Sequence, residues 1–247
     1  MIPPRSARRR RTTPALLALA VAAGAIAGAT AGPPTVAPPP AVAPPPAGAR
    51  KLPPDAIEAL LRKAEARYRG SGSFRASFRQ SFESASFGAG DEAHGTIHVS
   101  PPQRMLWDYV EPKGQRGVLD GNTWWFVVPE DREVQMRESQ PGEDSPLSDL
   151  LAGRSDLLKL FVARAPDSAL PTGPGRLLVE LWPQRPRDDI EWLRLEIDPA
   201  TGDVRRVEVG DPLGGRMLFE LGVPERETPL PDGSFRVEVP PGWTLVR

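Results

Sequence analysis

The sequence predicts a mainly β protein with helical additions (α+β), in which a single curved antiparallel sheet forms an unclosed β-barrel covered by short α-helices as a lid. Alternating apolar and polar residues recur in many short runs, turn residues separate these runs, and only two regions show helical spacing. A large twisted antiparallel sheet tends to curl, and apolar helices need a surface to cover. We therefore expect the helices to lie across the open mouth of the barrel.

The first 31 residues have the composition of a secretory signal peptide. Residues 1–11 contain five arginines and no acid, residues 15–29 are apolar and rich in alanine, and Ala29-Thr30-Ala31 supplies small residues for cleavage. The alternative is an uncleaved anchor, but the apolar stretch is shorter than the roughly 20 residues that a spanning helix needs. We expect export to the periplasm, by the general secretory or the twin-arginine route.

Residues 32–54 form a proline-rich segment with ten prolines and little charge. Such a segment cannot build a core and favours the extended polyproline II conformation. We expect a solvated, disordered leader, and a spacer or docking segment is the alternative. Residues 55–247 are then the predicted folded domain.

Composition excludes several classes of function. The chain contains no cysteine, which rules out disulfides, thiolate catalysis, cysteine-ligated zinc and a lipid-modified N-terminal cysteine. Without the five arginines of the signal peptide, 26 basic side chains face 32 acidic ones, a formal charge of −6. Nucleic-acid binding depends on clustered Lys and Arg, so we expect no nucleic-acid partner.

Two regions predict helices. Asp55 and Glu58 have capping-box spacing, and an apolar stripe follows at helical intervals up to Gly70. The stripe consists of Ile57, Leu60, Leu61, Ala64 and Tyr68. The leucine-rich region 145–161 predicts two short helices broken at Gly153.

Short runs along the rest of the chain predict a meander of strands. In residues 73–83, Phe74, Phe78 and Phe82 alternate with polar residues, which is typical of an antiparallel sheet with one solvated face. The predicted strands are residues 73–83, 93–99, 104–110, 115–119, 123–128, 132–137, 177–182, 190–197, 204–209, 216–221 and 235–239.

Motifs for catalysis or metal binding are weak. His94 and His98 share one face of a predicted strand, but four residues of strand separate them by about 13 Å, too far for one metal ion. Residues 210–215 are glycine-rich but lie between strands, and Asp188-Asp189 has the pattern of a hairpin tip. We therefore expect no metal, no cofactor and no enzymatic activity. A periplasmic hydrolase is an alternative that no residue specifically supports.

Large apolar residues are the most prominent feature. Met105, Trp107 and Tyr109 share one face of a predicted strand, and Trp124, Trp125 and Phe126 follow one another on another strand. Ordinary core packing is one interpretation of these residues, and the wall of an apolar cavity is the other.

At these residues the chain resembles the outer-membrane lipoprotein carrier (LolA) family. The resemblance begins at residues 74–80, which are similar to the family pattern Phe-x-Ala-x-Phe-x-Gln, and its most specific part is residues 120–126 followed by Pro129. The remaining matches are Gly95-Thr96-Ile97, Pro102, Trp107-Asp108-Tyr109, Glu111-Pro112 and the lid-like Leu150-Leu151-Ala152-Gly153.

The resemblance implies an unclosed β-barrel with a helical lid over a hydrophobic cavity. It implies a monomeric periplasmic carrier that takes triacylated lipoproteins from an inner-membrane transporter to an outer-membrane acceptor. The alternative is a sensor or carrier of another lipid or glycolipid with the same fold. The lipid-binding residues that it implies are Phe78, Met105, Trp107 and Trp125 on the sheet and Leu147, Leu150 and Leu151 on the lid.

One departure from the family pattern concerns the lid. The family commonly has an arginine just before the proline that matches Pro102, and this arginine holds the lid by hydrogen bonds. Pro101 occupies that position here. Arg104 is a possible substitute, although its place in the strand alternation points it away from Trp107.

Overall fold

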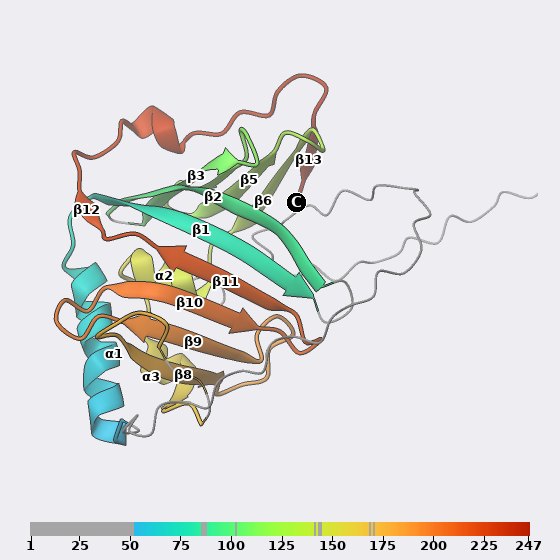
Figure 1. The fold of residues 1–247 in the computed structure, drawn as a ribbon. Helices are drawn as coiled ribbons and strands as arrows, with labels where there is room; N and C mark the ends of the chain where they lie inside the picture. The colour runs from blue at the N-terminus through green and yellow to red at the C-terminus, as the bar shows by residue number, and fades with distance from the viewer. Residues whose placement is uncertain are drawn as a thin grey trace, which may run out of the picture.

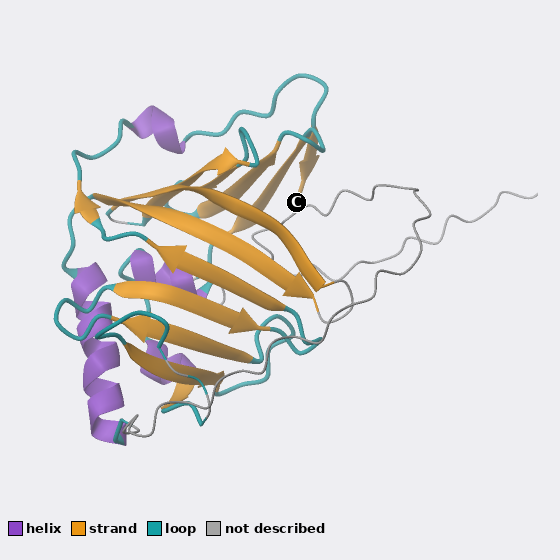
Figure 2. Ribbon diagram, viewed as in Figure 1, coloured by secondary structure: helices purple, strands orange, loops and turns teal. Residues whose placement is uncertain are grey.

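A computed structural model describes residues 52–84, 88–101, 103–140, 142, 145–167, 169 and 171–247. The predicted signal peptide, residues 1–31, and nearly all of the proline-rich segment lie outside the described residues. Within them, one large antiparallel sheet curves around a core, and the α-helices gather on one side of it (Figures 1 and 2).

The sheet has the order β13-β6-β5-β4-β3-β2-β1-β11-β10-β9-β8-β7, and β12 pairs with β1 beside this path. Its strands are β1 Phe74–Ser84, β2 Gly88–Ser100, β3 Arg104–Glu111, β4 Arg116–Leu119, β5 Thr123–Val128, β6 Glu133–Glu138, β7 Phe161–Arg164, β8 Leu177–Pro183, β9 Trp192–Ile197, β10 Val204–Gly210, β11 Arg216–Leu221, β12 Glu225–Arg226 and β13 Thr244–Val246.

Consecutive strands are neighbours in two meanders, β1 to β6 and β7 to β11, which the pairing of β1 with β11 joins into one sheet (Figure 1). All pairings among the described strands are antiparallel except the parallel pair of β13 with β6. The path ends at β13 on one side and β7 on the other, so the sheet curls without closing. The predicted class, an unclosed antiparallel barrel with short helices, is confirmed.

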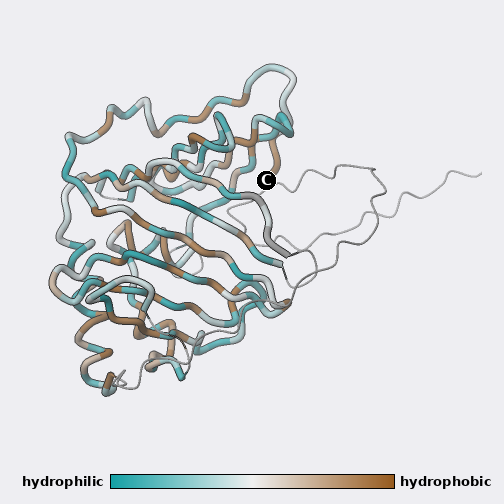
Figure 3. Tube along the Cα trace, in the orientation of Figure 1, coloured by the Kyte–Doolittle hydropathy of each residue, from teal (hydrophilic) through white to brown (hydrophobic). Residues whose placement is uncertain are grey.

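Strand alternation decides which side chains face the core. Along β1, Phe74 and Phe78 are buried whereas Arg75 and Arg79 are exposed, and hydropathy alternates along the strands in the same way (Figure 3). Directly paired residues on neighbouring strands point to the same face of the sheet. Phe78 pairs with Gly95 on β2 and with Leu221 on β11, so these strands share its inner face. The inner residues of all the central strands therefore meet in one apolar cluster.

Helix α1, Pro54–Arg69, buries the predicted stripe in this cluster. The predicted capping box at its start is wrong. The helix begins one residue earlier than Asp55, Pro53 occupies the N-cap position, and no side chain caps it. Proline at the first helical position needs no amide partner, so a cap is dispensable there. Glu58 instead accepts hydrogen bonds from Arg62, one turn further along.

The middle region folds as α2, Pro146–Leu151, and α3, Leu157–Leu160, with Gly153 between them at φ +70°. A Cβ atom on Gly153 would lie 2.9 Å from the Cα atom of Arg69, so the turn can approach α1 because it has no side chain. The predicted break at Gly153 is confirmed. Phe161, predicted as helical, instead opens the edge strand β7.

The predicted strand 235–239 is wrong. Residues Asp232–Phe235 form the 3₁₀ helix η1, which Figure 2 shows apart from the α-helices, and β13 follows later. Phe235 packs on the outer face of the sheet against Leu106 and Val118. Burial against this second apolar patch stabilises the segment without strand pairing. The short strands β7, β12 and β13 escaped prediction because two to four residues show little periodicity.

We expect Gly95→Ala to destabilise the fold strongly. Gly95 lies next to a register shift between β2 and β3, and a Cβ atom there would overlap the carbonyl oxygen of Asp108 and sit 2.9 Å from Phe78. The strands would have to separate, at a cost of about 3 kcal/mol. Gly72→Ala is the matched control, because its Cβ would meet no atom within 4 Å. Equal free energies of unfolding in urea for the two variants would contradict this account.

Candidate lipid-binding site

An apolar cavity of about 400 Å³ lies on the inner side of the sheet. Asp189 precedes β9, Asp211 follows β10, and Met217 pairs with Phe82 near the end of β1, so these residues gather at one end of the sheet. At the opposite end, Tyr68 of α1 packs on Phe74 with ring centroids 5.9 Å apart. Helix α1 thus packs at one end of the half-barrel, and the cavity lies toward the other end.

Most of the cavity wall is aromatic or aliphatic. Its volume falls within the roughly 300–1,000 Å³ of ordinary small-ligand sites, which are mainly apolar with a few polar groups. The apolar lining residues are Phe82, Trp107, Trp124, Phe126, Met136, Pro146, Leu147, Ile190, Leu193, Val209, Met217, Phe219 and Val246. The polar lining residues are Gln135, Arg137, Ser145, Ser148, Asp189, Asp211 and Arg247. Such a wall suits hydrocarbon and offers charges only to the polar part of a ligand.

Two of the seven residues predicted for lipid binding line this cavity, Trp107 and Leu147. Phe78 lies directly behind Trp107, with ring centroids 5.0 Å apart, and the Met105 sulfur accepts a hydrogen bond from Trp107 Nε1 at 3.0 Å. Leu150 and Leu151 are buried in the core cluster. These four residues support the wall rather than form it.

The expected place of Trp125 in the cavity is wrong. The rings of Trp124 and Phe126 stack with their centroids 5.7 Å apart, and both residues line the cavity. Trp125, between them, points to the outer face and packs on the cluster around Phe235. Its Nε1 donates to Asp120 Oδ2 at 2.9 Å. Burial would raise the pKa of the Asp120 carboxyl, but this bond and those from backbone amides hold the pKa below its usual value.

Helix α2 forms the lid wall of the cavity, and a buried ion pair holds it. The Asp149 carboxylate lies 2.7 Å from Arg154 Nη2, and the two side chains are 2% and 8% exposed. Arg154 also donates to Ser139 Oγ, next to β6, and the amide of Gly142 donates to Asp149 Oδ2. These contacts therefore join α2 to the residues on either side of it and to the end of the preceding strand β6.

Comparison with known proteins identifies the family. Residues 69–238 match the family described as "Outer membrane lipoprotein carrier protein LolA". The chain belongs to the LolA family. An outer-membrane lipoprotein carrier protein of Dechloromonas aromatica is 29% identical over 172 residues, covering 70% of this chain and 80% of that protein.

A protein of the same description from Methylobacillus flagellatus is 23% identical over 192 residues, covering 78% of this chain and 89% of its own length. Among solved structures, a LolA superfamily protein from Nitrosomonas europaea has a TM-score of 0.41 at 12% identity and covers 73% of this chain and 97% of its own.

In this LolA-family chain, Pro101 stands where the family commonly has an arginine that holds the lid. Pro101 lies exposed in a turn. Arg104 faces outward, where it pairs with Asp232 and lies over the Phe235 ring, so it is no substitute. Arg187 donates to the carbonyl oxygen of Gly142 at 3.1 Å. It also forms two hydrogen bonds of 2.9 Å with Asp189 at the cavity wall.

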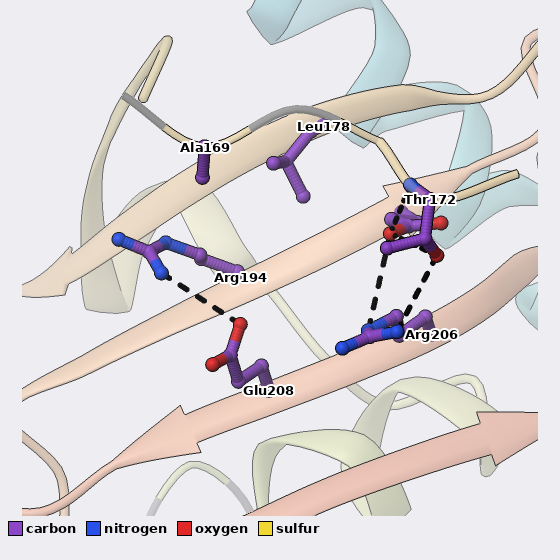
Figure 4. A pocket seen from close by; sticks show the side chains of 7 residues that line it. Ala169, Thr172, Leu178, Arg194, Arg206 and Glu208 are labelled. Atoms are coloured by element: carbon purple, nitrogen blue, oxygen red, sulfur yellow. Dashed lines mark hydrogen bonds and ion pairs between the residues drawn. The ribbon is translucent and has the colours of Figure 1, made fainter. Parts of the chain in front are cut away.

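A second hollow, of about 90 Å³, lies on the opposite face of β8, β9 and β10 in this LolA-family sheet (Figure 4). Its charged groups pair with one another. Arg194 Nη1 lies 3.7 Å from Glu208 Oε2, and Arg206 donates to Thr172 Oγ1 (Figure 4). We interpret it as a gap in a cross-strand network of ion pairs, because these charges already satisfy one another.

Neither a cluster of metal ligands nor a membrane-spanning helix is found among the described residues of this LolA-family fold. Within the described ranges, no three His, Asp or Glu side chains gather closely enough to hold a metal ion. His98, one of the two predicted outer-face histidines, lies 3.1 Å from Glu227. In the same part of the chain, every helix is too short or too polar to cross a membrane.

Proposed function

We propose that this protein is a periplasmic carrier of lipoproteins that shields their acyl chains and moves them from an inner-membrane transporter to an outer-membrane acceptor. The apolar cavity beneath α2, in a chain of the LolA family, is the observation that carries the proposal. The relatives from Dechloromonas and Methylobacillus are named outer-membrane lipoprotein carrier proteins, which supports a lipoprotein cargo and delivery to the outer membrane.

The physical task matches the site. Removing one acyl methylene from water gains about 0.8 kcal/mol of free energy. Lipid chains must therefore be shielded from water to cross an aqueous space. A cavity wall of Trp, Phe, Leu and Met side chains provides burial without strict shape requirements. This task needs no bond chemistry, so we propose a carrier without a cofactor or catalytic residues.

Release must also be possible, because a carrier that binds too tightly cannot deliver its cargo. The lid contacts are a small set of hydrogen bonds and ion pairs centred on Asp149, Arg154 and Arg187. Such contacts can break and re-form as α2 moves, and cargo would favour the open state by its greater affinity for it.

The direct test is extraction of cargo. The purified protein is added to inner-membrane vesicles that contain radiolabelled triacylated lipoprotein and an active lipoprotein-releasing transporter. We expect a soluble complex of protein and lipoprotein, absent when the transporter is omitted. No soluble lipoprotein would refute the carrier function. Mass spectrometry of lipids that co-purify with the protein distinguishes a lipoprotein carrier from a carrier or sensor of another lipid or glycolipid.

A further inference from the structure

A buried polar pair lies inside the otherwise apolar inner face. Gln80 of β1 is 2% exposed, and its neighbours on the same face of the strand are Phe78 and Phe82. Tyr109 of β3 is 5% exposed, and its hydroxyl donates to Gln80 Oε1 at 3.0 Å. Burial raises the pKa of Tyr109 well above its usual value, so the phenol keeps the proton that it donates in this bond.

This bond fixes the orientation of the Gln80 amide. With Oε1 turned toward Tyr109, the NH₂ group points the other way, where its partner is Met217 Sδ at 3.5 Å. A thioether is a weak acceptor, and the amide carries two N–H donors. Among the described residues Nε2 has no stronger acceptor. Leaving a buried donor so poorly satisfied costs about 1–3 kcal/mol.

The poorly satisfied donor stands directly behind the cavity wall. Gln80 pairs across β1 and β11 with Phe219, and both Phe219 and Met217 line the cavity. Met217 thus separates Gln80 Nε2 from the hollow. A methionine side chain is unbranched and flexible, so it can move aside when a ligand enters.

We propose that Gln80 is the polar anchor of the lipid site and that Nε2 donates a hydrogen bond to the carbonyl oxygen of an acyl ester or amide. The proposal rests on the carrier function. The carbonyl is a far better acceptor than the Met217 sulfur, and it joins the acyl chain to the rest of the cargo. An anchor at this depth sets how far the chain enters the cavity, and it favours acylated ligands over plain hydrocarbon.

The test compares methyl palmitate with hexadecane, each competing with a fluorescent lipid probe for the purified full chain. The wild type is expected to prefer the ester. Gln80→Leu removes the donor, and the double variant Gln80→Leu/Tyr109→Phe also removes the hydroxyl that would lose its acceptor. We expect the ester-to-alkane affinity ratio to fall by about 3- to 10-fold in both variants, the loss of one hydrogen bond. Gln103→Leu, in an exposed turn, is the matched control.

Infrared spectra of carbonyl-labelled methyl palmitate give a second measurement that needs no variant. The wild type should shift the ester carbonyl stretch to lower frequency, as hydrogen bonding does. An unshifted band, or an unchanged affinity ratio in the double variant, overturns the role of Gln80 but leaves the carrier function standing. If the wild type binds neither ligand nor the probe, the lipid site itself is refuted.

Discussion

Val209→Trp is expected to weaken lipid binding by about tenfold or more while the protein stays folded. Val209 lines the cavity, and it pairs with Leu193 on one side and Met217 on the other, both of which also line it. An indole in this position would project into the hollow and occupy space that hydrocarbon needs. Each acyl methylene that is kept out of the cavity loses about 0.8 kcal/mol of binding free energy. Excluding as few as two methylenes therefore lowers the affinity about tenfold.

The measurement is displacement of a fluorescent lipid probe, together with lipoprotein release from inner-membrane vesicles. Val110→Trp is the matched control, because Val110 lies on β3 with its side chain 59% exposed. It adds the same indole outside the cavity and should retain binding. Thermal unfolding checks that both variants are folded. Undiminished binding by a folded Val209→Trp would show that lipid does not use this cavity.

We expect Asp149→Ala to cause the largest loss of stability among changes in the lid. The carboxylate is 2% exposed and pairs with the buried Arg154 guanidinium, so the substitution removes a buried charge that neutralises that cation. It also takes the acceptor from the Gly142 amide. Breaking a buried ion pair from one side costs about 3–5 kcal/mol. Chemical denaturation followed by tryptophan fluorescence measures the change.

Two controls distinguish the loss of the buried ion pair from the loss of any single charge. Asp232→Ala breaks the Arg104 pair, in which the aspartate is 77% exposed, and should cost at most about 1 kcal/mol. The double variant Asp149→Leu/Arg154→Leu removes both charges and should recover much of the loss. A single Asp149→Ala variant as stable as Asp232→Ala would mean that the lid does not depend on this pair.

The sequence by itself determined the class of the fold and most of its elements. Alternation in residues 73–83 defined both the strand β1 and its inner face, because every second side chain there is polar. The stripe of α1 and the break at Gly153 were equally clear, since helical spacing and a glycine in a tight turn are local properties. The family resemblance rested on residues that the family match also covers.

Only the tertiary structure decided which residues form the site. Trp124, Trp125 and Phe126 are all apolar, so alternation cannot show which of them face inward. The outer face of β3, β4 and β5 also carries apolar residues, and the segment around Phe235 covers them. Other wall residues come from β1, β9, β10 and β11, which are distant in sequence from β5. Their contribution depends on the register that pairs β1 with β11. Register and packing place a side chain at the wall or behind it, and neither leaves a local signal.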